Sequence, residues 1–216
     1  MKTVLGLAAV ALLAQPAVAQ VYEPRDYGND REVEYVEVNP RAGFRVEGKV
    51  FFESLSDPEE DEGVIYEFGN GFGYGVEAGF DIAAGDTLAI GPYASYEWSN
   101  VERCVETICV RGKDFFAVGI HAGLATGPNS QVFAKLAYSE LTTEFDGSFT
   151  DDFTGELVVF DIEDSGGGFV IGLGYEQGFG ENFYGRANVE VGENYDILET
   201  FDIQRVTAGV SLGTRF

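Results

Sequence analysis

The chain contains few basic residues. Lysine and arginine together number 13, against 37 aspartate and glutamate residues, and the formal net charge is −24. Proteins bind nucleic acids largely through lysine and arginine side chains that neutralise phosphates. A chain this acidic lacks that chemistry, so the sequence excludes nucleic acid as a partner.

Long apolar runs are also missing. No stretch of 18 consecutive apolar residues occurs, so the sequence offers no transmembrane helix. The amino terminus has the pattern of a secretory signal peptide. Lys2 supplies the positive charge, residues 4–14 form a short apolar segment, and Ala17, Val18 and Ala19 form a small-x-small cleavage site. We predict a signal peptide over residues 1–19 and an exported chain that begins at Gln20.

Cysteine occurs twice, and histidine, methionine and tryptophan once each. Cys104 and Cys109 lie close together in a polar, turn-like segment. Export brings them into an oxidising compartment that permits a disulfide. The alternative is a metal site, but two cysteines without a nearby histidine supply too few ligands for zinc. We predict a disulfide between Cys104 and Cys109, with no metal centre and no cofactor.

Glycine and aromatic residues are abundant, with 29 Gly, 18 Phe and 11 Tyr, a composition that favours a β protein. The last 12 residues alternate strictly, with apolar side chains such as Val206, Ala208 and Val210 on one face and Arg205 and Thr207 on the other. A period of two residues indicates a strand. The same period recurs upstream, and it predicts eight strands, at residues 42–53, 71–82, 88–98, 116–124, 132–139, 168–176, 184–191 and 205–216.

The connections between these strands alternate between long and short. The short turns contain Gly, Asn or Asp, whereas the long connections at residues 54–63, 140–165 and 192–204 are acidic. Strands long enough to cross a bilayer at a tilt, with short turns on one side and long loops on the other, are typical of outer-membrane barrels. We predict an all-β fold, an eight-stranded antiparallel up-and-down transmembrane β-barrel over residues 42–216. A flexible acidic extension over residues 20–41 precedes it, and the long loops face outside the cell.

If the apolar face of each strand meets lipid, the other face lines an interior just wide enough for side chains to fill. Buried charges persist only when they are paired. We therefore predict a salt-bridge network that plugs the lumen, with inward glycines leaving room for long side chains. The alternative is a narrow gated pore. The predicted network consists of Arg45, Glu47, Lys49, Glu77, Lys135, Glu176, Arg186, Glu190 and Arg205.

Aromatic side chains near the strand ends form a second expected feature. They suit girdles at the two membrane surfaces, although a soluble sandwich would use the same residues as its core. The residues concerned are Phe52, Phe72, Phe80, Tyr96, Trp98, Tyr138, Phe169, Tyr175, Phe183 and Phe216.

The final segment, from Gly209 to Phe216, resembles the carboxyl-terminal ending of a known protein family. With this ending, the chain resembles the small outer-membrane β-barrel family that includes OmpA-type transmembrane domains, OmpX and opacity-like porins. In that family such an ending is recognised by the barrel assembly machinery, so the resemblance implies that Val210, Leu212 and Phe216 form an assembly signal. Thr214 stands where the family often has an aromatic residue. The resemblance also implies a Gram-negative outer membrane, a monomer, and lipid and lipopolysaccharide as surroundings.

An enzymatic role finds little support in the sequence. Barrels that resemble the lipid A deacylase use a histidine and a serine two positions apart, but His121 is followed at position 123 by a glycine and its alternation points inward. A haem ligand is a second role considered for His121, and a structural role is favoured. We predict that the protein is not an enzyme.

The acidic loops are the candidate external sites. Calcium binds several carboxylate oxygens at once, so divalent cations are considered there, although no EF-hand spacing occurs and solvated, mutually repelling loops are favoured. The two clusters are Asp57, Glu59, Glu60, Asp61 and Glu62, and Asp151, Asp152, Glu156, Asp161, Glu163 and Asp164. Three functions remain: a structural or surface-interaction barrel, a small porin-like channel, and a soluble periplasmic sandwich.

Overall fold

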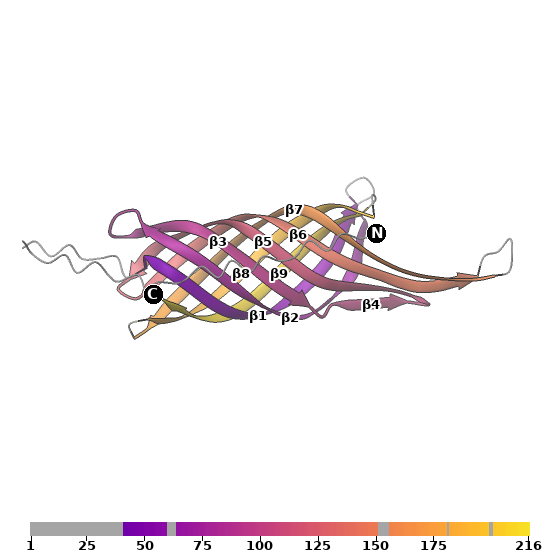
Figure 1. Ribbon diagram of the computed structural model, residues 1–216, viewed down its shortest axis with the longest axis horizontal. Coiled ribbons are helices and arrows are strands. Elements are labelled where there is room, and N and C mark those ends of the chain that lie inside the picture. The colour runs from indigo at the N-terminus through magenta and orange to yellow at the C-terminus, as the bar shows by residue number, and fades with distance from the viewer. Residues whose placement is uncertain (1–40, 60–63, 151–155, 181, 199–200) are drawn as a thin grey trace, which may run out of the picture.

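The fold consists of antiparallel strands wound around one axis (Figure 1). A computed structural model describes residues 41–59, 64–150, 156–180, 182–198 and 201–216. The expected signal peptide and all but the last residue of the expected extension lie outside these ranges. The strands are β1 (Gly43–Glu59), β2 (Val64–Ala83), β3 (Leu88–Ser99), β4 (Glu102–Val105), β5 (Ile108–Gly127), β6 (Ser130–Thr150), β7 (Leu157–Phe179), β8 (Phe183–Ile197) and β9 (Phe201–Arg215).

Eight of these strands close into a ring. The order is β3-β2-β1-β9-β8-β7-β6-β5, and β3 pairs with β5 to complete the circle. The first and last strands meet in an antiparallel ladder that runs from Arg45 opposite Arg215 to Ser56 opposite Gln204. Among the described strands, the short strand β4 pairs only with β5, and it stands outside the ring. The predicted eight-stranded antiparallel barrel is therefore confirmed, and the closed ring rules out the soluble two-sheet sandwich.

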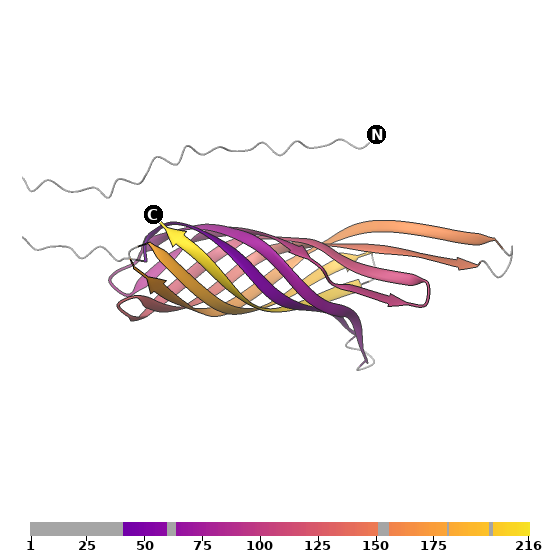
Figure 2. The same ribbon diagram turned by 90° about the horizontal axis from the view of Figure 1, so that it is seen from below.

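Several strands extend further than the sequence analysis predicted. The segment 140–165 was expected to be a loop, but β6 and β7 stay paired from Ser130 opposite Gln177 to Thr150 opposite Leu157. Together with β4 and the start of β5 they form a sheet that projects beyond the barrel (Figure 2). The expectation of a long acidic loop was wrong because the alternation of side chains continues through the charged residues.

The outer wall of the barrel is apolar. Large hydrophobic side chains such as Phe72 (71% exposed) and Leu212 (72%) point away from the axis, while charged residues of the same strands are buried inside. All ten aromatic residues expected at the membrane surfaces are exposed on this wall. Such a surface is unstable in water and stable in hydrocarbon. In the described part of the chain, no helix is long and apolar enough to span a membrane.

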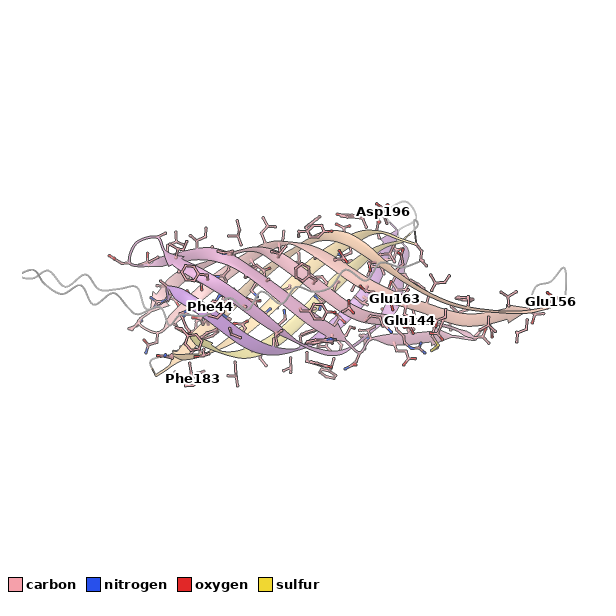
Figure 3. All side chains as sticks on the ribbon, viewed as in Figure 1. Phe44, Glu144, Glu156, Glu163, Phe183 and Asp196 are labelled. Atoms are coloured by element: carbon pink, nitrogen blue, oxygen red, sulfur yellow. A yellow bond between two sulfur atoms is a disulfide. The ribbon has the colours of Figure 1, made fainter. Side chains whose placement is uncertain are left out.

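The two ends of the barrel differ. At one end β2–β3, β5–β6 and β7–β8 join through short turns, and positive φ values at Gly85 (95°) and Gly180 (71°) allow two of these reversals. Phe44 and Phe183 mark this end in Figure 3, and the carboxyl terminus lies there too. Glu144, Glu156 and Glu163 lie at the other end, where the strands project. The predicted asymmetry of turns is present, with strand extensions in place of long loops.

Inward glycines make room for the side chains of the lumen. A Cβ atom at Gly73 would overlap the ring of Phe51 and lie 2.8 Å from the carbonyl oxygen of Trp98, and one at Gly79 would lie 2.8 Å from the guanidinium carbon of Arg45. Gly48, on the outer wall, has nothing within 4 Å of such an atom. The lumen is therefore packed against glycine at specific points.

We expect Gly73→Ala to destabilise the folded barrel by about 1–3 kcal/mol, because the added methyl group overpacks the lumen. Gly48→Ala is the matched control, and it should be neutral or stabilise by about 0.4–1 kcal/mol, because the site has space and alanine restricts the unfolded chain. Urea unfolding in detergent micelles, followed by tryptophan fluorescence, measures both. Equal effects of the two substitutions would contradict the proposed packing.

Candidate functional site

The lumen collects charged residues from seven of the eight barrel strands, and His121 from β5. The nine residues predicted to form the network are all buried there. Five more residues take part that were not among those nine: Glu53, Asp81, Glu97, His121 and Arg215. All five lie on the inward face of the predicted strands, and His121 was already expected to point inward, so the strand pattern was sufficient to find them.

The network begins at the short-turn end of the barrel. Arg215 lies 3.0 Å from Glu176, whose other contact is Arg186 at 2.7 Å. Arg186 in turn reaches Glu47 at 3.1 Å and Glu77 at 3.5 Å. These pairs join β9, β7, β8, β1 and β2, so the charges link strands that are far apart in sequence.

From Glu77 the ion pairs continue toward the projecting end. Lys135 lies 2.5 Å from Glu77 and 3.1 Å from Glu190, and Glu190 lies 3.7 Å from Lys49. Lys49 also contacts Glu97. Cations and carboxylates therefore alternate along the axis, and each of these charges has at least one opposite neighbour.

The last pairs of the network surround Arg205. Its guanidinium contacts Glu53 and lies 2.6 Å from Glu97, and it also lies 4.0 Å from the ring centre of Phe115. A cation over an aromatic face is attracted by the ring quadrupole. Arg205 thus ends the charged part of the lumen and touches its apolar part.

His121 is fully buried within this network. Its Nδ1 atom lies 3.1 Å from Asp81 Oδ1, and its Nε2 atom lies 3.3 Å from Arg186 Nη2. Both ring nitrogens are engaged, so neither is free to act on a substrate or to bind a metal. The geometry matches the structural role favoured from the sequence.

Aromatic side chains pack against the cations of the lumen. Arg186 lies over the rings of Phe133 and Tyr184, at 4.7 and 5.0 Å, and Lys135 lies 5.1 Å from the ring centre of Tyr93. Tyr184 also donates a hydrogen bond of 2.9 Å to Glu47. The interior is thus a packed core of charges and rings.

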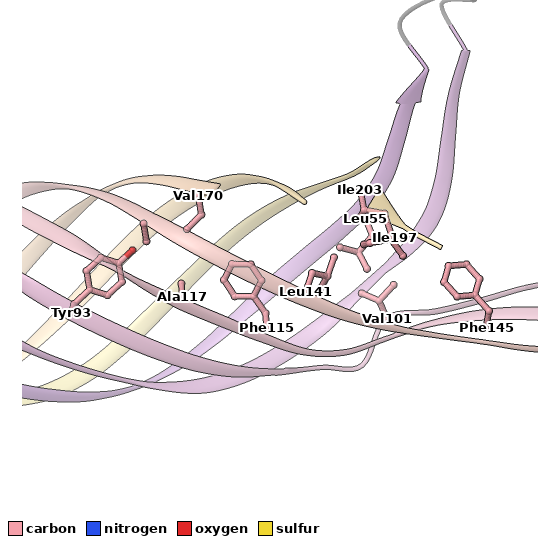
Figure 4. Packing of buried hydrophobic residues seen from close by; sticks show 11 residues of the cluster. Leu55, Tyr93, Val101, Phe115, Ala117, Leu141, Phe145, Val170, Ile197 and Ile203 are labelled. Carbon is pink, nitrogen blue, oxygen red and sulfur yellow. The ribbon is translucent and has the colours of Figure 1, made fainter. Parts of the chain in front are cut away.

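An apolar cluster fills the lumen beyond Arg205, toward the projecting end (Figure 4). We call it the apolar cap, and its members are Leu55, Val101, Phe115, Leu141, Phe145, Ile197 and Ile203. The sequence analysis missed this cluster. Leu55 and Ile203 each lie two residues from a charged member of the network, Glu53 and Arg205, so an extended alternation could have found them.

The projecting sheet carries its own charges on its outer face. Arg111 lies 2.9 Å from Glu102 and 3.0 Å from Glu144, and it also contacts Asp146. Lys113 contacts Glu144 as well. Hydrogen bonds from Lys113 and Arg111 lower the pKa of Glu144 below its ordinary value. Two cations from β5 therefore neutralise the carboxylates of β6.

The carboxylates of β7 lie next in the same rows. Glu163 is directly opposite Glu144, and Asp161 is directly opposite Asp146. Like charges in such cross-strand positions repel each other unless cations lie nearby. Glu144 and Asp146 contact these cations directly. Asp161 and Glu163 are exposed at the margin of the sheet, and they attract Lys113 from beyond ion-pair distance.

The two cysteines lie opposite each other in the β4–β5 hairpin. Their sulfur atoms are bonded at 1.99 Å. Glu102 lies beside them, but sulfur atoms in a disulfide are poor metal ligands because the thiolate is the form that binds. The hairpin therefore has a covalent cross-link, and its cysteines cannot serve as thiolate ligands while the disulfide is intact.

The acidic clusters are placed differently from expectation. Asp57 belongs to β1 and is buried, so its assignment to a solvated loop was wrong. Glu156, Asp161, Glu163 and Asp164 lie on the projecting sheet or at its tip. The side chain of Glu59, residues 60–62, and residues 151 and 152 lie outside the description.

The residues of the expected assembly signal lie at the barrel seam. Val210, Leu212 and Phe216 all point outward. The ring of Phe216 stacks on that of Phe44 at 6.4 Å, and the two backbones exchange hydrogen bonds of 2.8 and 3.2 Å. Phe216 thus completes the contact between the first and last strands.

Solved structures with a similar fold include bacterial surface and outer-membrane proteins. Neisserial surface protein A is 13% identical over 81% of this chain and 98% of its own, with a TM-score of 0.51. The attachment invasion locus protein Ail of Yersinia pestis is also 13% identical, over 80% of this chain and 99% of its own, with a TM-score of 0.47. No protein-family model and no curated protein sequence matches the chain.

The closed ring, the apolar wall and the likeness to Neisserial surface protein A define the class of fold. It is that of the small eight-stranded outer-membrane β-barrels. The fold implied by the sequence resemblance is confirmed at this level.

We expect Arg205→Met to destabilise the barrel by about 3–5 kcal/mol, because it leaves Glu53 buried without its cation. Adding Glu53→Gln should recover part of this loss, since the remaining side chain is then neutral. Arg103→Met, which removes an exposed ion pair with Glu67 on the projecting end, should have little effect. Urea titrations of the four proteins in micelles provide the comparison, and no recovery in the double variant would contradict the pairing.

Proposed function

We propose that the chain is an integral outer-membrane protein with a structural or surface-interaction role. Its lumen is closed, and its projecting sheet lies outside the cell. Lipid covers the apolar wall, and the barrel assembly machinery inserts the monomer by recognising Val210, Leu212 and Phe216. The observation that carries the proposal is the filled interior, because it leaves the projecting sheet as the part of the molecule that can meet a partner.

Two successive layers support a closed lumen. The ion-pair network fills the barrel from Arg215 to Arg205, and the apolar cap continues from there. Ions cross neither layer readily, because the charges of the first are paired with one another and the second is lined by apolar side chains. This arrangement favours the plugged barrel over the porin-like channel.

The orientation follows from the ends of the chain. The amino-terminal end of β1 and the carboxyl-terminal end of β9 both lie at the end of the barrel that carries the short turns. The signal-peptide pattern predicts that the chain is exported to the periplasm before it inserts into the membrane. In outer-membrane barrels the short turns face the periplasm and the long connections face outside. The projecting sheet accordingly faces outside, where lipopolysaccharide and other surface molecules surround it.

The lysines provide a direct test of this orientation. The lysines of the described chain are Lys49, Lys113 and Lys135, and of these only Lys113, with 40% of its side chain exposed, is accessible to a reagent. A membrane-impermeant amine reagent should label Lys113 on intact cells, as mass spectrometry of the isolated barrel would show. Lys113→Arg is the control and should lose the label. Labelling that requires permeabilised cells would refute the orientation.

Planar-bilayer recording tests the closed lumen. The native protein should give no steady conductance, whereas Phe115→Gly, Leu141→Gly, Lys135→Ser and Glu190→Ser combined should open a path through both layers. Val189→Ala, on the lipid-facing wall, is the control that should stay closed. A steady native channel that Ala137→Trp abolishes by filling the lumen would contradict the proposal and favour the porin.

A further inference from the structure

The projecting sheet has one long free edge. Inside the barrel β7 pairs with β6 on one side and β8 on the other, but the β8 ladder ends where Gly167 meets Tyr195. From Leu157 to Glu163, none of the described strands pairs with the outer side of β7. Figure 2 shows this part of the hairpin extending past the other strands.

The hydrogen-bond pattern identifies the backbone groups on this edge. The amide of Gly178 donates to the Asn129 carbonyl at 2.7 Å, so even-numbered residues of β7 bond to the β6 side. The β6–β7 ladder from Ser130 to Thr150 has no register shift, so the same alternation holds along its whole length. On the β5 side of β6, the amide of Ser148 donates to the carbonyl of Thr107. Even-numbered residues of β6 therefore bond to β5 and odd-numbered ones to β7, as this alternation requires. Odd-numbered residues of β7 therefore turn their N–H and C=O groups outward. They are Leu157, Val159, Asp161 and Glu163.

The side chains along this edge change character from tip to base. Near the tip Leu157 (67% exposed), Val158 and Val159 (71%) are apolar and reach both faces of the sheet. Nearer the barrel Asp161 and Glu163 project from the outer face, with Ile162 exposed on the other. The chain from position 140 to 165 contains no lysine or arginine.

We propose that this edge binds an extended segment of a partner protein by strand addition, and that the segment carries apolar residues opposite the tip and lysine or arginine opposite Asp161 and Glu163. The proposal deepens the surface role proposed above and rests on it. Exposed strand edges recruit extended chains through main-chain hydrogen bonds, and alternate side chains give the selectivity.

The charges favour this occupant over a second copy of the chain. Pairing of two β7 edges would bring Asp161 and Glu163 of both copies together, and like charges across strands destabilise a ladder. A cationic strand would instead complete the row that begins with Arg111 and Glu144 and ends in Glu163. The charges along the β7 edge therefore disfavour pairing with a second copy of the chain and favour pairing with a basic strand.

A synthetic peptide can test the proposal on the purified barrel in detergent micelles. The probe is a fluorescein-labelled heptapeptide with the sequence lysine-valine-lysine-valine-threonine-valine-valine, blocked at both ends, and fluorescence anisotropy measures its binding. Val159→Pro removes an outward N–H without touching the β6 ladder and should weaken binding at least tenfold. Val159→Thr keeps that N–H and should change binding less than twofold. Heat-modifiable gel migration shows that both variants fold.

Two further comparisons separate backbone pairing from charge. Asp161→Asn with Glu163→Gln should weaken binding several-fold and reduce its salt dependence. A peptide N-methylated at every second residue has the same charge but cannot form a ladder, and it should not bind. Equal binding by that peptide, or unaltered binding to Val159→Pro, would overturn the proposal in favour of charge attraction alone.

Self-association is the other outcome that would overturn it. A barrel that dimerises in micelles, and becomes monomeric with Val159→Pro, would show that the edge pairs with a second copy. The peptide measurements use purified protein, so they do not depend on where the barrel lies in the cell. A failed surface label with intact peptide binding would therefore refute the orientation and leave the edge as a binding site.

Discussion

The pairing of buried charges is the constraint on which the rest of this barrel depends. The network contains seven carboxylates and six lysine or arginine side chains, together with His121. They are Glu47, Glu53, Glu77, Asp81, Glu97, Glu176 and Glu190, and Arg45, Lys49, Lys135, Arg186, Arg205 and Arg215. A slip of one residue in any strand would turn such side chains into lipid and apolar ones into the lumen. The network therefore fixes the register of all eight strands at once.

The side chains that fill the lumen also explain why the barrel wall contains so many glycines. Long charged side chains and aromatic rings occupy more space than an eight-stranded ring of bulky residues would leave, so glycine lies where they approach most closely. Gly79 faces the Arg45 guanidinium and Gly73 faces the Phe51 ring. The apolar cap then covers the last cation, Arg205, on the side that faces the projecting sheet. The high glycine content and the packing of the lumen thus both follow from the need to fill the barrel with long charged side chains and aromatic rings.

Alternation alone was enough to predict the strands of the barrel and the residues that point inward. It could not predict partners, because Arg205 and Glu97 are 108 residues apart and their contact depends on the closure of the ring. The projecting hairpin was missed for a different reason. Taken alone, residues 140–165 resemble a solvated loop, because this segment contains no cation. The cations that neutralise Glu144 are Arg111 and Lys113, and both come from β5. The apolar cap was missed because the strands were ended too early.

Closure removes strand edges only where the ring is complete. Beyond the barrel the same strands regain edges, and edges are sites of uncontrolled pairing unless something protects them. On one side β4 is only four residues long, and a disulfide joins it to β5. On the other side β7 is long and apolar at its tip, and its protection is the negative charge of Asp161 and Glu163. Charge is a selective protection, because it repels a second acidic copy and attracts a cationic strand. The residues that keep this sheet from pairing with itself are therefore the ones that define what it can bind.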